Sequence, residues 1–227
     1  MQKNILCTKE MQRRFTPEMQ HAALKKNTLC QETKTVVSMS SIDNNSMSLL
    51  TAAYMFQTRY ATQDDVPAIV ALVESAYRGE SSRHGWTTEA DLLDGQRTDD
   101  EEVSCLLAQP GNHFLLHEQQ SLLASLHLQN QSELAYLGMF AVDPQCQGQG
   151  IGAQMLRRAE QIAFEEWGCN QLQMTVIRQR EDLIAWYQRH GYRLTGEIRP
   201  FPYGNPRFGL PRRDDLQLHV LSKFTTG

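Results

Sequence analysis

The sequence lacks a strong excess of charge of either sign and any hydrophobic run long enough to cross a membrane. Its 227 residues include 22 Lys and Arg against 26 Asp and Glu, a net charge of −4 at pH 7. Without a basic stripe, the chain has no electrostatic footprint for nucleic acid. A spanning helix needs about 18 consecutive apolar residues, and no stretch approaches that length. We therefore expect neither a nucleic-acid partner nor a membrane partner.

Cysteines are few, and their spacing matches no metal-binding pattern. They form no C-x-x-C pair and no group with histidine at metal-ligand spacing. An odd number at irregular intervals favours reduced thiols and a cytoplasmic protein. We expect no metal site from the five residues Cys7, Cys30, Cys105, Cys146 and Cys169.

The first part of the chain also lacks a sustained hydrophobic period. Residues 1–54 are rich in Gln, Lys, Ser, Thr and Asn, and such composition buries too little apolar surface to offset the entropy of ordering. We expect a poorly structured extension over 1–54 and a folded domain over 55–224.

From residue 56 onward, the hydrophobic periods of strands and helices alternate. Strands are expected over 56–61, 113–118, 122–129, 134–142, 172–177, 192–197 and 216–221. Helices are expected over 66–77, over a short stretch opening at Thr88, and over 99–110, 152–167 and 180–190. Consecutive antiparallel strands followed by a β-α-β-α-β stretch predict an α/β (α+β) domain. Its single mixed, mostly antiparallel central sheet would be flanked by helices.

A glycine-rich turn lies between the strand ending at Val142 and the helix starting near Gly152. Gly148, Gly150 and Gly152 alternate with larger residues, and glycine lets a backbone approach a ligand closely. The unpaired N–H groups of the following helix end point outward with the positive end of the helix dipole. The turn is therefore predicted to bind a phosphate group.

Two nucleotide motifs are rivals for this turn. The chain has no G-K-[ST], which argues against a nucleotide triphosphatase loop. Gly148, Gly150 and Ala153 do satisfy G-x-G-x-x-A, the dinucleotide fingerprint. That motif follows its strand directly, whereas Asp143–Gln147 intervene here. The dinucleotide alternative is weaker but stays open.

Several segments resemble one known family. Gln147-x-x-Gly150-x-Gly152 resembles the Q/R-x-x-G-x-G/A turn of the GNAT superfamily of N-acetyltransferases, and Leu137–Pro144 is similar to its splayed central strand. The run Leu183–Tyr192, with its Tyr-x-x-x-Gly-aromatic pattern, resembles the family's tyrosine-bearing helix and following strand. The resemblance covers about residues 56–223. It implies the acyl-CoA N-acyltransferase fold, in which two central strands splay apart.

The resemblance also implies an activity and a cofactor. Members transfer the acetyl group of acetyl-CoA to a primary amine, by direct attack in a ternary complex and without a metal. The turn holds the pyrophosphate through main-chain N–H groups, and the pantetheine arm runs beside the preceding strand. The implied cofactor-binding residues are Met139, Phe140, Ala141, Val142, Gln147, Gly148, Gln149, Gly150, Ile151, Gly152, Ala153 and Arg180.

The implied catalytic residue is Tyr187. It occupies the position at which the family has the phenol that hydrogen-bonds to or protonates the leaving sulfur. A phenol with a pKa of about 10 keeps its proton at neutral pH. Some members have a glutamate base where this chain has Tyr136, so we expect a water chain to deprotonate the amine. Arg180 replaces an asparagine that contacts the pantetheine in many members. Whether Arg180 reaches coenzyme A or only solvent stays open.

The acceptor pocket is expected between the loops 78–94 and 201–213, which carry aromatic and charged side chains. Arginines there can hold a carboxylate and acids an ammonium group. The substrate-binding candidates are Arg83, Trp86, Glu89, Tyr136, Tyr203 and Arg207. The expected acceptor is a small-molecule amine or an amino acid, and a homodimer is compatible with the sequence. A protein or peptide acetyltransferase, and a coenzyme A-binding module without turnover, stay open.

Overall fold

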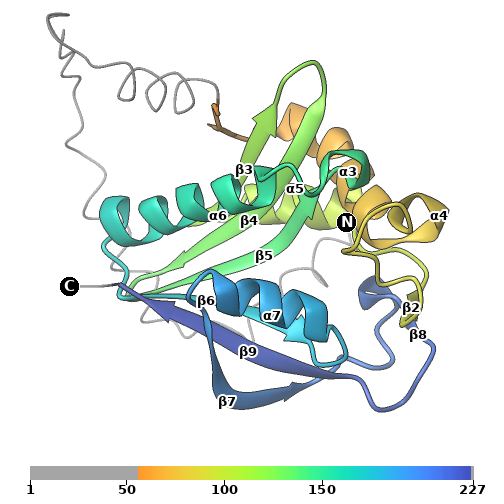
Figure 1. Cartoon of the computed structure of the whole chain (residues 1–227). Coiled ribbons are helices and arrows are strands. Elements are labelled where there is room, and N and C mark those ends of the chain that lie inside the picture. The colour runs from red at the N-terminus through yellow and green to blue at the C-terminus, as the bar shows by residue number, and fades with distance from the viewer. Residues whose placement is uncertain (1–55, 226–227) are drawn as a thin grey trace, which may run out of the picture. The chain divides into compact units, whose positions relative to one another are not determined.

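The computed structural model describes residues 56–225, without the side chain of Arg207. The expected N-terminal extension, 1–54, lies outside the described residues. Contacts group the chain from Arg59 onward into one unit, drawn in Figure 1.

The framework of this unit is a seven-stranded sheet in the order β1-β3-β4-β5-β6-β9-β7. All its neighbouring strands are antiparallel except the central pair, β5 and β6. This confirms the expected mixed, mostly antiparallel sheet. The strands are β1 (Arg59–Tyr60), β3 (Asn112–Glu118), β4 (Leu122–Gln131), β5 (Leu134–Val142), β6 (Gln171–Ile177), β7 (Arg193–Pro200) and β9 (Gln217–Phe224).

The two central strands separate along their length, as the resemblance implied. β5 pairs with β6 only over Leu134–Tyr136, opposite Gln171–Gln173. Beyond that point β5 stays paired with β4 as far as Val142, while β6 follows β9 as far as Ile177. A bulge marks the divergence, because the β4–β5 register shifts next to Met139, whose φ is +42°. The separated half of β5 therefore has an edge without a neighbouring strand.

Helices cover both faces of the sheet. Figure 1 shows α6 (Ile151–Gln161) and α7 (Glu181–Arg189) in front of the strands and α5 (Asp100–Leu107) behind them. α3 (Val66–Tyr77) packs on β4, β5 and α5, so it lies on the same face as α5. α6 continues into a π-helical turn, Ile162–Glu166, and the chain stops being helical at Gly168, whose φ is +68°. The long helix expected over 152–167 is therefore confirmed with a changed final turn.

The short helix expected from Thr88 is wrong. The preceding stretch forms a short helix instead, α4 (Gly79–Ser82), and β2 (Leu93–Asp94) pairs with β8 (Leu210–Pro211) in a small second sheet. The Thr88 hydroxyl accepts a hydrogen bond from Ala90 N–H at 3.2 Å and shares another with Ser82. The Thr88 side chain thus binds the backbone as a capping residue would, but pairing of Leu93 with Pro211 prevents a helix from forming.

The second sheet joins the two loops that were expected to build the acceptor pocket. Leu93 shares a small apolar cluster with Ile177, Phe201 and Leu216, and Arg212 makes two hydrogen bonds to the Asp94 carboxylate, at 2.8 and 2.6 Å. The late loop also contains a 3-10 turn, Pro206–Phe208. Two further 3-10 turns lie directly before α3, at Gln63–Asp65, and in the glycine-rich segment, at Pro144–Cys146. Residues 78–94 and 201–213 thus form one structural region.

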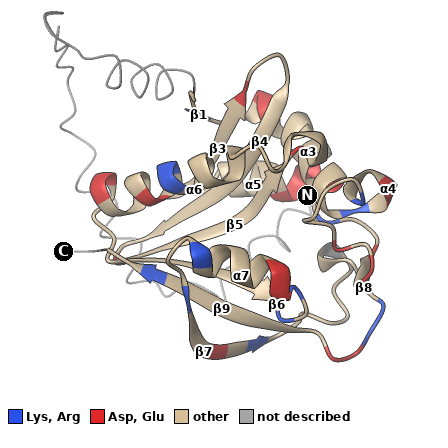
Figure 2. Ribbon diagram, viewed as in Figure 1, with Lys and Arg blue, Asp and Glu red and all other residues tan. Residues whose placement is uncertain are grey.

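The structure bears on the expectations about membranes, metal ions and thiols. Within 56–225, no helix is long and apolar enough to cross a membrane, and no group of three or more potential metal ligands occurs in that part of the chain. Figure 2 shows residues of both signs on α6 and, on α7, acidic residues at the start and a basic residue at the end. Cys146 and Cys169 are free thiols, whereas Cys105 is disulfide-bonded, so the expectation of reduced thiols is wrong at Cys105.

Candidate active site

The glycine turn is open to solvent on its ligand side. Gly148 and Gly150 have φ values of +79° and +84°, and a Cβ added at either would meet no atom within 4 Å. Gly150 is the residue that precedes α6, so the N–H groups of the first helical turn, which lack helical partners, face the turn. The exposed backbone and the helix dipole together suit a diphosphate.

The separated edge of β5 leads away from this turn. The Asp143 N–H donates to the Leu123 carbonyl oxygen at 2.9 Å, and strand alternation therefore turns the N–H and C=O of Val142 away from β4. The Val142 carbonyl accepts from the Gln147 side chain at 3.0 Å, and the Phe140 carbonyl accepts from the Tyr77 hydroxyl at 2.6 Å. Two carbonyl acceptors on this stretch are thus occupied by the chain itself.

Tyr187 lies on the buried face of α7, close to the point where β5 and β6 part. Its side chain is only slightly exposed, and its ring contacts Trp186 and Tyr192. Within the described part of the chain, no hydrogen bond engages its hydroxyl. Burial raises the pKa of the Tyr187 phenol well above its ordinary value, and the neighbouring Tyr77 and Tyr136 add to the rise. The hydroxyl therefore keeps its proton and remains available to donate it.

Tyr136 and Tyr77 complete a cluster of phenols around Tyr187. The Tyr136 hydroxyl lies 2.9 Å from that of Thr175, and its ring packs over Gly138, where a Cβ would be 3.2 Å away. Tyr136, the last β5 residue paired with β6, thus also links the two strands through its side chain. Burial, and next the Glu89 carboxylate, raise the pKa of Tyr77 to about 12.

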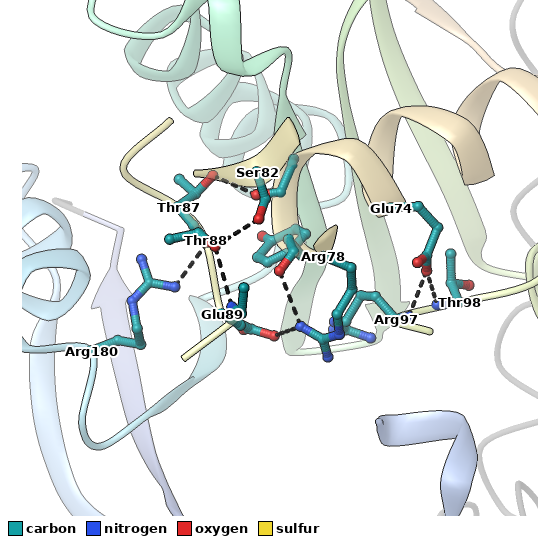
Figure 3. A network of polar contacts seen from close by, with 12 residues as sticks. Glu74, Arg78, Ser82, Thr87, Thr88, Glu89, Arg97, Thr98 and Arg180 are labelled. Atoms are coloured by element: carbon teal, nitrogen blue, oxygen red, sulfur yellow. Dashed lines mark hydrogen bonds and ion pairs between the residues drawn. The ribbon is translucent and has the colours of Figure 1, made fainter. Parts of the chain in front are cut away.

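The loop after α4 is fastened to this site from two directions. The Gln147 amide donates to the Thr87 hydroxyl at 2.8 Å, and its oxygen accepts from the Trp86 N–H at 2.9 Å. Arg180, at the start of α7, donates to the Thr87 carbonyl at 2.9 Å (Figure 3) and to the Trp86 carbonyl at 3.0 Å. Both side chains therefore position the loop, a function that sequence reasoning did not assign to them.

Trp86 lies beside the predicted cofactor residues. Its ring centroid is 6.0 Å from that of Trp186, and Trp186 in turn contacts Phe140. A Cβ at Gly152 would lie 3.7 Å from the Trp186 ring and 3.8 Å from Val142. Aromatic side chains thus line the region between the glycine turn and α7.

The other acceptor candidates are scattered. Glu89 is nearly buried and pairs with Arg78 at 2.6 Å, beneath the joined loops. Arg83 is exposed and pairs with Asp91 at 2.9 Å. The Tyr203 hydroxyl accepts from Leu216 N–H at 2.7 Å, so it braces the late loop. Only the backbone of Arg207 is described. The structure therefore brings Trp86 and Tyr136 towards Tyr187. It brings Glu89 towards Tyr77 and leaves Arg83 and Tyr203 in other contacts.

Sequence reasoning missed three residues that the structure places here, Tyr77, Arg78 and Arg97. Tyr77 ends α3 and binds the β5 bulge, and Arg97 lies over its ring, with the guanidinium carbon 5.7 Å from the centroid. The available signal was a tyrosine-arginine pair at a helix end, directly before a long polar loop. That signal is too common to single out a site.

Known proteins share this architecture. The family model for the acetyltransferase (GNAT) family matches residues 68–192. A spermine/spermidine N(1)-acetyltransferase of Bacillus subtilis is 29% identical over 69 residues, which are 30% of this chain and 45% of that protein. The chain thus matches under half the length of this curated relative.

Solved structures agree in fold over most of the chain. The ribosomal-protein-S18-alanine N-acetyltransferase of Escherichia coli superposes with a TM-score of 0.55 at 18% identity, over 76% of this chain and 97% of that one. The yncA protein of Salmonella typhimurium, solved with its cofactor acetyl-CoA, gives a TM-score of 0.56 at 16% identity, over 76% and 95%. Together with the splayed strands, the glycine turn and the family match, these findings show that the chain belongs to the GNAT acetyltransferase family.

Proposed function

We propose that the protein transfers the acetyl group of acetyl-CoA to a primary amine of a small molecule or amino acid, by direct attack in a ternary complex. The observation that carries this proposal is the free edge of β5. It runs from the open glycine turn, next to Val142, to the buried phenol of Tyr187, near Tyr136. A cofactor with a diphosphate at one end and a thioester at the other matches that path.

The residues present fit acetyl-CoA. Backbone N–H groups from Gln147 to Ala153 would hold the diphosphate, which explains why no lysine or arginine side chain is needed there. The N–H of Val142 points away from β4, as its carbonyl does, and would pair with the amide carbonyls of the pantetheine arm as an added strand does. When bound, acetyl-CoA supplies the activated acyl group.

Tyr187 would hold the proton that the departing sulfur requires. A thiol has a pKa of about 8.5, whereas a free phenol has a pKa of about 10. Because burial raises the pKa of Tyr187 further, the hydroxyl is protonated throughout the neutral range and can donate to the sulfur as charge develops. Its lack of a competing hydrogen bond among the described residues leaves it free to do so. We expect water to take the proton of the amine, since Tyr136 stands in place of a carboxylate base.

The test is release of coenzyme A thiol from acetyl-CoA with a panel of amines, amino acids and peptides. We expect turnover with small amines or amino acids. Turnover confined to peptides would move the assignment to a peptide acetyltransferase, and tight calorimetric binding of NADP but not acetyl-CoA would refute it. A cytoplasmic location belongs to this proposal too: the free thiols of Cys146 and Cys169 support it, and the disulfide at Cys105 is the observation against it.

A further inference from the structure

Arg78 is a buried cation whose side chain is only partly satisfied. Its residue is 6% exposed, and its Nη1 donates to the Glu89 carboxylate at 2.6 Å. Its Nε and Nη2 have no hydrogen-bond partner among the described residues. Leaving a buried donor of a charged group unpaired is costly, so native structures keep such groups for a reason.

The unpaired atoms form the edge with which a guanidinium binds an acidic group. Nε and Nη2 point in parallel and match the two oxygens of a carboxylate or phosphate. The late loop lies against this edge, because a Cβ at Gly209 would lie 3.1 Å from Nη2. Since Nε and Nη2 are both covered, an acidic group would reach them by displacing this loop.

Arg97 supplies a second guanidinium in the same place. Glu74 accepts from the N–H groups of Arg97 and Thr98, at 2.5 and 2.8 Å, and so fixes the backbone (Figure 3). The guanidinium lies over the Tyr77 ring and makes no ion pair or hydrogen bond with the residues the structure describes.

Arginines and carboxylates both gather around this point. Three arginines, Arg78, Arg97 and Arg180, and one carboxylate, Glu89, act electrostatically on the Tyr77 hydroxyl. Glu89, which pairs with Arg78, and Glu102 also act on Arg97, but the Arg97 guanidinium has no ion pair of its own among the described residues. An anionic group between the two guanidinium groups would supply that pair, whereas a polycation would not.

This cluster borders the reacting end of the site. The same Tyr77 that carries Arg97 on its ring donates to the Phe140 carbonyl in the β5 bulge, and Tyr77 adds to the rise in the pKa of Tyr187. An acidic group held by the arginines could therefore belong to the same molecule as the amine that is acetylated.

We infer that the acceptor is an amino-acid-like molecule, whose acidic group is bound by the Nε–Nη2 edge of Arg78 and by the guanidinium of Arg97. This inference rests on the proposed function and narrows its substrate class. A polyamine such as spermidine lacks the acidic group and brings extra positive charge, so it is a poor acceptor.

The experiment compares each L-amino acid with its carboxamide and includes spermidine, with coenzyme A release as the readout. The acid and the amide share the amine and the side chain and differ in the anionic group. We expect kcat/KM for the best acid to exceed that for its amide at least tenfold. Arg97→Gln should reduce this ratio at least tenfold with an unchanged Kd for acetyl-CoA. Arg178→Gln, at an exposed arginine outside this cluster that donates to Gln217, should leave the ratio unchanged.

Arg78→Lys keeps the charge but lacks the two-donor edge, and should also reduce the ratio. Should that variant fail to fold, Arg97→Gln decides alone. Amides or spermidine used as well as acids, or an unchanged ratio in Arg97→Gln, overturn the inference. If no amine releases coenzyme A, the proposed function fails. Calorimetry of acids and amides with the protein–coenzyme A complex then judges the inference separately, with acid preference supporting it and equal or absent binding refuting it.

Discussion

Substitution of Arg180 distinguishes a role in binding the cofactor from a role in positioning the acceptor loop. The family resemblance places it among the coenzyme A contacts, whereas the structure shows it donating to the Thr87 and Trp86 carbonyls at 2.9 and 3.0 Å. Arg180→Met keeps much of the apolar stem and removes both donors. We therefore expect this variant to release the loop while leaving the glycine turn intact.

The expected loss of activity follows from these two hydrogen bonds. A hydrogen bond to a charged group contributes about 1.5–3 kcal/mol, and the freed carbonyls recover part of that from water. A net loss of about 2 kcal/mol corresponds to about 30-fold, which we expect in kcat/KM for the acceptor. The Kd for acetyl-CoA, measured by calorimetry, should change less than about threefold, because Gln147 still holds the loop.

The matched control is Arg178→Met, two residues earlier, where the arginine is exposed and donates to Gln217 at 3.0 Å. This variant should behave as wild type in both measurements. Acetyl-CoA binding weakened at least tenfold in Arg180→Met, with acceptor kinetics unchanged, would refute the positioning role and restore the cofactor assignment.

Three further predictions concern the phenol, the turn and the core. Tyr187→Phe should lower kcat about 10²-fold or more with little change in the Kd for acetyl-CoA. The control is Tyr192→Phe, whose ring contacts that of Tyr187 and which should keep the wild-type turnover. Equal losses in kcat and in affinity for acetyl-CoA in Tyr187→Phe would indicate a packing role. Gly150→Val should abolish acetyl-CoA binding in calorimetry. The control is Gly196→Val, where the glycine has a similar φ of +87° and equally open space. This variant should have the same backbone strain and still bind acetyl-CoA. Burial, and then His113, lower the pKa of His127 to about 4, so its unfolded form gains a proton first as pH falls below about 6.5. Urea unfolding should show about 2 kcal/mol lost between pH 7.5 and 5 through this group, a loss that His127→Gln should lack; identical pH profiles would contradict it.

The parts of the fold that sequence reasoning predicted are those with local causes. Gly148 and Gly150 need positive φ, and Gly168 ends its helix for the same reason. Thr62 and Asp65 form a capping box directly before α3. The glycine turn and the position of Tyr187 follow from such local signals plus the family pattern.

The rest depends on contacts between distant segments. Nothing near Gln147 or Arg180 in sequence indicates that both bind the same loop some 60 to 94 residues away. Thr88 is a valid cap, yet pairing of β2 with β8 decides the conformation of the residues after it. Arg78 and Arg97 become a pair only because Tyr77 and Glu89 lie between them, which no periodicity encodes.

The last strand of the sheet order, β7, has a consequence for self-association. A terminal strand offers unpaired backbone groups along one side, which invite another chain to add. Leu194 and Ile198 are 42% and 49% exposed, so they add apolar surface to this strand. Between them the register with β9 shifts, and Gly196 takes a positive φ, so the border is kinked and not straight. A neighbouring molecule can align with one half of β7 at a time, which limits the open-ended stacking that an uninterrupted apolar margin would promote.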